Sequence, residues 1–207
     1  EKPAEIRSFL IDAGASVNGY ACDITRTYSK EDDEFASFVE LVDGLQQELV
    51  GEVRAGYDFA ELHLLCHLKI AKLLDETGIA KGSSDALIET GVTSAFYPHG
   101  LGHFLGIQVH DMGGHMGDDT GTIIDPPSGH PFLRLTRLLE TNQVLTIEPG
   151  LYVIDMLIED LRGTPGHDFI NHERLDWLRP YGGVRIEDNV RVLDDSCENL
   201  TRDAFGG

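Results

Sequence analysis

The segment at residues 99–111 concentrates side chains that can bind a metal ion or transfer a proton. Three histidines are interspersed with three glycines: His99, His103, His110, Gly100, Gly102 and Gly106. Each glycine costs roughly 1 kcal/mol relative to alanine inside a helix. We therefore expect a glycine-rich loop that brings imidazoles toward a ligand and runs into a short strand over residues 106–110. Because two histidines four residues apart are a weak metal signal, a loop with surface histidines remains an alternative.

Two aspartates are placed to face one another across a hairpin. Asn18-Gly19 lies between strand-like runs at residues 9–17 and 20–28, a pattern typical of a type I′ turn. A two-residue loop sets Asp12 opposite Thr25, so Asp12 and Asp23 become diagonal neighbours with Cα atoms roughly 7–8 Å apart. Two carboxylates on one face repel each other unless a cation lies between them. Unrelated, solvent-facing aspartates remain the alternative.

Two glutamates occupy comparable positions near the C-terminal end of the sequence. Glu148 follows an expected strand at residues 144–147 and precedes Pro149-Gly150. Glu187 and Arg185 lie two residues apart in an expected strand at residues 183–190, so both side chains point to one face. A buried acid is rarely unpaired, and a salt bridge between Arg185 and Glu187 is the alternative to a metal site.

A second histidine pair, His63 and His67, has the spacing of a helical metal motif. It lacks the glutamate of the His-Glu-x-x-His pattern and lies within an apolar helix pattern, so we interpret it as structural. The odd number of cysteines, three without close pairing, indicates reduced thiols and a cytoplasmic setting.

The remaining pattern predicts one α+β domain. We expect helices over residues 31–54 and 59–77, and a shorter one beginning at Ser83 or Ser84 and ending near Gly91. Residues 113–130 form a long loop, residues 151–154 a strand, and residues 156–180 an irregular segment with a short helix at 173–178. This order predicts a curved, mostly antiparallel sheet backed by helices.

The composition excludes several classes of partner. The 207 residues carry a net charge of −20, which argues against binding nucleic acid or anionic membranes. No apolar run reaches the length of about 18 residues expected of a membrane span. The N-terminus has neither the form of a signal peptide nor an initiating methionine, so we expect a fragment of a cytoplasmic protein.

The candidate ligands form a hard, oxygen-rich set that suits two divalent cations better than a structural zinc site. They are Asp12, Asp23, His103, Glu148 and Glu187. Two metals held close together can share a bridging hydroxide as a nucleophile near neutral pH.

The sequence resembles the methionine aminopeptidase, prolidase and creatinase superfamily of metallopeptidases, which share the pita-bread fold. The five ligands match in order and spacing. The longer strings IDAG, NGY and DITRTY within residues 11–28, HGLGHFLGIQVHD at 99–111 and GGVRIEDN at 182–189 are similar to bacterial Xaa-Pro dipeptidases and the related organophosphorus acid anhydrolases. The resemblance implies that residues 1–207 are a C-terminal catalytic domain that is incomplete at its N-terminal side and lacks the family's separate N-terminal domain.

The resemblance also implies roles for individual residues. Asp12 would bind one metal, His103 and Glu148 the other, and Asp23 and Glu187 both. The implied catalytic residues are His99, His110, Arg185 and Glu148, and the implied substrate-binding residues are His99, Arg134 and Phe59. Phe59 stands at the position where the resemblance implies a pocket tyrosine in close relatives. Mn²⁺ is the expected ion, with Co²⁺ or Zn²⁺ as alternatives.

The function implied by the resemblance is hydrolysis of Xaa-Pro dipeptides, with organophosphate esters and fluoridates as a further substrate class. Arg134 would bind the free carboxylate of the dipeptide. An aminopeptidase P acting on longer peptides and a non-catalytic peptide-binding fragment are the alternatives. The resemblance implies a homodimer for the full-length protein.

Overall fold

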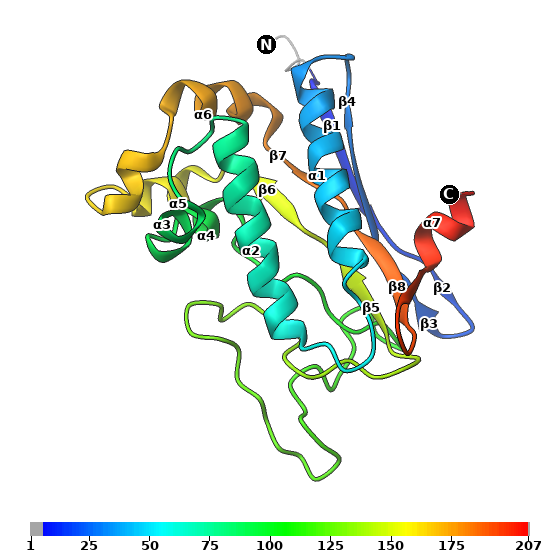
Figure 1. Ribbon diagram of the computed structural model, residues 1–207. Coiled ribbons are helices and arrows are strands. Elements are labelled where there is room, and N and C mark those ends of the chain that lie inside the picture. Colours follow the sequence, from blue (N-terminus) through cyan, green and yellow to red (C-terminus); the bar gives the residue numbers. More distant parts are fainter. Residues whose placement is uncertain (1–5, 207) are drawn as a thin grey trace.

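The computed structural model describes residues 6–206, in which every pairing of named strands is antiparallel. The strand pairs are β1 (Ser8–Ala13) with β4 (Ile24–Ser29), β2 (Ser16–Val17) with β3 (Tyr20–Ala21), β5 (Val144–Ile147) with β8 (Asp188–Val192), β8 with β9 (Cys197–Asn199), and β6 (Gly150–Tyr152) with β7 (Gly183–Arg185). A single bridge between Thr25 and Glu187 links the N-terminal hairpin to the C-terminal strands. The expected curved antiparallel sheet is therefore confirmed (Figure 1).

Two long helices lie against the strands, as Figure 1 shows. They are α1 (Glu34–Val50) and α2 (Phe59–Glu76), and the shorter helices are α3 (Ser84–Glu89), α4 (Val92–Phe96), α5 (Asp155–Asp160), α6 (His172–Leu178) and α7 (Leu200–Phe205), with 3₁₀ turns η1 (Pro165–Phe169) and η2 (Arg179–Tyr181). The carboxylate of Asp33 accepts from the first turn of α1, and that of Asp58 does so at α2. These caps satisfy N–H groups that a helix start leaves free. No helix within residues 6–206 is long and apolar enough to cross a membrane.

The apolar stripe predicted for the first helix is buried. Phe35 and Leu49 are fully buried near its two ends, and Phe38 and Val42 are nearly so between them. The side chains pack in one continuous core with α2 and with β5, β6, β7 and β8. This core holds the strand pairs in place beside the helices.

The N-terminal hairpin has the predicted register and an interruption that was not predicted. Asn18 and Gly19 both adopt positive φ, 53° and 83°, as a type I′ turn requires. Asp12 pairs with Thr25, as expected. The ladder breaks beside Gly14, where a Cβ atom would collide with the carbonyl of Cys22. The break turns the backbone of Asp23 away from the hairpin, and its N–H donates to Asn189 Oδ1 at 3.1 Å.

A second interruption, between β7 and β8, positions Glu148 and Glu187. The predicted strand at 183–190 is split into β7 and β8, and the register of β5 with β8 continues into that of β6 with β7. Glu148 and Glu187 therefore lie opposite one another at the break. The N–H of Glu148 donates to Leu101 O at 2.8 Å, and that of Glu187 donates to Thr25 O at 3.0 Å. The break thus connects the C-terminal strands to both the glycine-rich loop and the hairpin.

Several expected elements differ in the structure. Residues 106–110 are a series of bends and not a strand. The chain folds back there, because the N–H of Asp111 donates to Phe104 O at 3.0 Å and the Asp111 carboxylate lies against Gly106. The segment 156–180 is more helical than expected, and the strand expected at 151–154 begins and ends earlier, as Gly150–Tyr152. Residues 113–130 form the expected loop, which Figure 1 shows extending below the helices.

Candidate active site and metal centre

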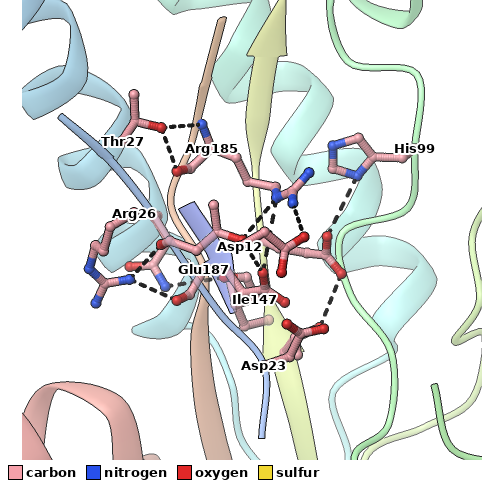
Figure 2. A network of polar contacts seen from close by, with 12 residues as sticks. Asp12, Asp23, Arg26, Thr27, His99, Ile147, Arg185 and Glu187 are labelled. Atoms are coloured by element: carbon pink, nitrogen blue, oxygen red, sulfur yellow. Dashed lines mark hydrogen bonds and ion pairs between the residues drawn. The ribbon is translucent and has the colours of Figure 1, made fainter. Parts of the chain in front are cut away.

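One cleft of about 770 Å³ collects the residues that the sequence singled out. Its polar lining includes Asp12, Asp23, His99, His103, His110, His115, Arg134, Glu148, Arg185 and Glu187. In Figure 2, Asp12, Asp23, Arg185 and Glu187 gather between the strand pairs, and His99 faces them from a neighbouring segment. We call Asp12, Asp23, Glu148 and Glu187 the carboxylate cluster.

Phe59 does not lie in this cleft. It is the first residue of α2 and is fully buried in the hydrophobic core. Its placement gives no support to the expected contact with substrate, and the side chain acts in packing.

His103 presents one nitrogen to the carboxylate cluster. Its Nδ1 lies 3.0 Å from Phe104 O. Because a carbonyl oxygen can only accept, Nδ1 carries the proton and Nε2 is left with a lone pair. That Nε2 lies 3.5 Å from Glu148 Oε1 and 3.7 Å from Asp23 Oδ2. A nitrogen lone pair and two carboxylates thus face one another without a hydrogen atom between them, an arrangement that a cation fits.

Threonine hydroxyls orient the two glutamates. Thr25 Oγ1 donates to Glu187 Oε2 at 2.6 Å, and Thr146 Oγ1 donates to Glu148 Oε1 at 3.2 Å. Glu187 is nearly fully buried, and its Oε1 has no hydrogen-bond partner among the described residues. An unpaired buried carboxylate oxygen is costly, which marks this atom as a position for a metal ligand.

Arg185 and Tyr152 form a chain of hydrogen bonds that ends at His99. The Arg185 guanidinium pairs with Asp12, donates to Thr25 Oγ1 at 3.1 Å and donates to the Tyr152 hydroxyl at 3.3 Å. Tyr152 in turn donates to His99 Nε2 at 2.9 Å, since His99 Nδ1 lies 2.8 Å from Gly100 O and carries the proton. These contacts determine which nitrogen of His99 is protonated.

Burial raises the pKa values of three carboxyls of this cluster. It raises the pKa of Asp23 to about 6, with the charge of Asp12 as the second cause. It raises the pKa of Glu148 to about 7 against the opposing charge of Arg185, and that of Glu187 to about 8, where the charge of Glu148 adds to burial. The positive charge of Arg185 does not balance the negative charges of the four acids, so a further positive charge among them would relieve their repulsion.

Burial acts in the opposite direction on the imidazoles of the cleft. It lowers the pKa of His99 and of His103 to about 4. The pKa of His110 is also lowered, by burial and then by the charge of Arg134. All three rings are therefore neutral at pH 7. The rings of His103 and His110 meet edge to face with centroids 4.3 Å apart.

The ligand atoms lie close enough to share metal ions. One oxygen from each of Asp12, Asp23 and Glu187 can be chosen so that all lie within 4.8 Å of one another. Likewise, one ring nitrogen of His103 and one oxygen from each of Glu148 and Glu187 can be chosen so that all three atoms lie within 4.8 Å of one another. The five predicted ligands are thus brought together as two overlapping groups that have Glu187 in common.

Sequence reasoning missed His115, which lines the cleft, and three further polar residues that orient the site. Thr25 was placed opposite Asp12 but given no role, and Thr146 was read only as part of a strand. Tyr152 could have been found by strand periodicity, because it follows Glu148 by four residues and so points to the same side of an extended chain.

Comparisons with known proteins give one family. The sequence profile of metallopeptidase family M24 matches residues 3–194. Xaa-Pro dipeptidases from Stenotrophomonas maltophilia and Shewanella loihica are 52% and 53% identical to the chain over 204 and 201 residues. Those alignments cover 98% and 97% of this chain but 46% of each relative, so the chain spans about half the length of the relatives.

Solved structures give the same fold. Zn-substituted Escherichia coli aminopeptidase P in complex with product matches with a TM-score of 0.69 and 31% identity, over 95% of this chain and 38% of that one. Aminopeptidase PepP from Pseudomonas aeruginosa matches with a TM-score of 0.70 and 30% identity, over 94% of this chain and 38% of that one.

Proposed function

The chain belongs to metallopeptidase family M24, and we propose that it carries the metal-binding site of an enzyme that hydrolyses Xaa-Pro dipeptides. The observation that carries the proposal is the convergence of four carboxylates and the unprotonated Nε2 of His103 in one cleft. Relatives that are 52% and 53% identical to the chain are named Xaa-Pro dipeptidase, which supports this choice of substrate.

Two divalent metal ions fit the site, and Mn²⁺ is the proposed ion because carboxylate oxygens predominate among the ligands. The partnerless Oε1 of Glu187 and the repulsion within the carboxylate cluster support this fit. Asp12 would hold one ion, His103 and Glu148 the other, and Asp23 and Glu187 both. When bound, such ions polarise a carbonyl oxygen and lower the pKa of water.

The residues of the cleft then divide the remaining tasks. Glu148 takes the proton of the attacking water and returns it to the prolyl nitrogen as the C–N bond breaks, which releases a free amino acid and proline. His110 donates a hydrogen bond to the carbonyl oxygen as negative charge develops there. Arg185 and Tyr152 hold Asp12 and His99 in place.

Arg134 is the residue proposed to select dipeptides. It lines the same cleft as the metal ligands, at the end of the long loop. A guanidinium can bind a carboxylate through two parallel hydrogen bonds. The free carboxylate of a dipeptide lies only a few atoms from the scissile bond, whereas a longer peptide has an amide there and gains no such pair.

A comparison of substrate lengths tests the proposal. With Mn²⁺ added, Ala-Pro should be cleaved well, and Ala-Pro amide and Ala-Pro-Ala poorly, as measured by the kcat/KM of each. Equal kcat/KM for the dipeptide and tripeptide would replace the dipeptidase assignment with aminopeptidase P. No cleavage of any of the three, with both ions bound, would favour a non-catalytic peptide-binding role.

A further inference from the structure

A second group of potential metal ligands lies beside the catalytic cleft. None of its members belongs to the five ligands proposed above. His63 and His67 project from α2, and His130 comes from the loop that leads to Arg134. We call these three residues the histidine cluster. One ring nitrogen from each can be chosen so that all three lie within 4.8 Å of one another. The ring centroids are 4.6 to 4.8 Å apart, and His63 and His67 are almost completely buried.

Packing alone does not account for the polar atoms of this cluster. His63 Nδ1 is buried without a hydrogen-bond partner in the part of the chain that the structure describes. On the other side of the same ring, Nε2 lies 3.0 Å from His130 Nδ1. Two nitrogens bound to one tetrahedral Zn²⁺ at about 2.0–2.1 Å lie about 3.3 Å apart. The distance between the two nitrogens is therefore close to that of two ligands of one ion, and a turn of the rings that aims both lone pairs at a common point would let an ion replace the hydrogen bond.

The protonation states also suit a metal. Burial keeps His63 and His67 neutral at pH 7, so each ring has one nitrogen lone pair to offer. Either ring nitrogen of His63 can hold the proton, so offering the other nitrogen to an ion needs at most a change of tautomer and no net loss of a proton. His67 Nδ1 lies 3.0 Å from Thr93 Oγ1, and with Nδ1 as the donor in this contact, Nε2 carries the lone pair. A hydrogen bond on the second ring nitrogen is the usual support of a metal-binding histidine.

A small cavity supplies room for a fourth ligand. About 220 Å³ of space borders all three histidines, and its wall continues through Pro98, His99, Phe132 and Leu133, which also line the catalytic cleft. Tyr97 lies between the two groups, with its ring centroid 5.0 Å from that of His67 and 4.8 Å from that of His99. Three imidazoles and an open position form a donor set typical of Zn²⁺.

We infer that His63, His67 and His130 form a second metal site, which binds one Zn²⁺ ion and fastens residues 129–134 to α2. The site differs in chemistry from the carboxylate cluster, because neutral imidazoles favour Zn²⁺ and carboxylate oxygens favour Mn²⁺. His130 is only four residues from Arg134, so an ion bound here restrains the segment that reaches the catalytic cleft. The inference does not depend on the proposed peptidase activity.

Zinc titration of a variant with a disabled carboxylate cluster tests the inference. The background is Asp23→Asn/Glu187→Gln, and the probe is ZnCl₂ in isothermal titration calorimetry, with Co²⁺ absorption as a report of tetrahedral geometry. One ion per chain should bind in this background. Adding His67→Gln should abolish stoichiometric binding, whereas His172→Gln, which changes an exposed histidine of α6, should leave it intact.

Two further variants separate metal binding from folding. Thr93→Val should weaken Zn²⁺ binding about 10- to 100-fold, the usual effect of losing the partner of a metal-binding histidine. If His67→Gln does not fold by circular dichroism, His130→Gln makes the same test from the loop and leaves α2 intact. Hydrogen exchange of residues 129–134 should slow when Zn²⁺ is added to the background variant. Zinc binding that survives both histidine changes, or no stoichiometric binding in the background, would overturn the inference.

Discussion

The carboxylate cluster and the histidine cluster border adjoining cavities, yet they are assembled from different parts of the fold. The carboxylates come from strands and from the interruptions between them, with Thr25 and Glu187 separated by 162 residues. The histidines come from two turns of one helix and one loop, with His63 and His130 separated by 67 residues. The first cluster depends on the register of several strands, and the second on the docking of one loop against α2.

Burial affects the two clusters in opposite ways. It raises the pKa values of Asp23, Glu148 and Glu187, and it lowers those of His63 and His67. A carboxyl group is neutral only when it is protonated, whereas an imidazole is neutral once it has released its second ring proton. Near neutral pH a cation would therefore take the place of protons in the carboxylate cluster, whereas it would displace none in the histidine cluster.

The largest expected effect is the loss of activity when a shared ligand is removed. Asp23→Asn and Glu187→Gln should each lower kcat/KM for Ala-Pro by more than about 10³-fold, beyond the loss typical of one oxyanion donor. Metal analysis should find less than one Mn²⁺ per chain at the catalytic site, because each residue is proposed to contact both ions. Glu198→Gln, which changes a half-buried glutamate of β9 that pairs with Arg191 and does not line the cleft, is the matched control. Two tightly bound Mn²⁺ ions in either variant would contradict the assignment.

The next effect concerns a cleft residue that is not proposed to bind metal. His110→Ala should retain Mn²⁺ and lose about 10²- to 10³-fold in kcat for Ala-Pro, the usual cost of one hydrogen-bond donor to a developing oxyanion. Metal content and kcat are measured on the same preparation. A kcat close to that of the unchanged protein would remove His110 from the mechanism.

A smaller effect is expected at Arg134. A charge-assisted hydrogen bond contributes roughly 1.5–3 kcal/mol, so Arg134→Ala should raise KM for Ala-Pro about 10- to 150-fold. The difference between Ala-Pro and its amide should narrow, because the amide does not use the ion pair. Arg137→Ala is the control, since Arg137 pairs with Glu140 and does not line the cleft. Equal losses for the acid and the amide would show that Arg134 does not bind the carboxylate.

The smallest effect is the pH dependence of stability in the metal-free protein. Unfolded carboxyls titrate near pH 4 and unfolded imidazoles near pH 6.5. Above pH 6.5 the folded chain holds protons on Glu148 and Glu187 that the unfolded chain has released, so the free energy of unfolding should fall as pH rises toward 8.5. Below about pH 6 the unfolded chain protonates four imidazoles that stay neutral in the folded chain, and these outnumber the three acids that hold protons there, so the free energy of unfolding should also fall as pH drops. The four imidazoles are those of His63, His67, His99 and His103.

Urea midpoints in EDTA between pH 5 and 8.5 measure both limbs of this curve. Glu187→Gln should flatten the limb above pH 6.5, and His67→Gln should flatten the limb below it. Added Mn²⁺ should abolish the fall above pH 6.5, because the ions take the place of the protons. Midpoints that rise from pH 6.5 to 8.5 in EDTA would refute this account.

Strand-borne features could be predicted because local rules determine them. The Asn18-Gly19 turn sets the pairing of Asp12 with Thr25, and residue order fixes which side chains share a face. The arrangement of Arg185 and Glu187 followed from periodicity alone. These rules placed Asp12 near Asp23 and Arg185 near Glu187, whereas the grouping of all five expected ligands came from the resemblance to a family.

Features that depend on distant contacts could not be predicted. The chain at 106–110 bends because Asp111 returns to Gly106 and Phe104, and no local pattern of strand-forming residues records that return. The helix spacing of His63 and His67 was visible, but the approach of His130 depends on how the long loop docks. The expected role of Phe59 came from a family position, and its complete burial outside the cleft does not support that role.

The long sequence separation within the carboxylate cluster has a consequence for the order of events during synthesis. The hairpin that carries Asp12 and Asp23 is made before the C-terminal strands, with Phe9 and Ile11 exposed on it even in the folded chain. Glu187 is made 57 residues after His130, which takes about 3–11 s at 5–20 residues per second. All residues of the histidine cluster are therefore present on the nascent chain before the carboxylate cluster is complete. If both proposed sites bind metal, the first ion that the nascent chain meets can therefore differ from the ion proposed for the carboxylate cluster.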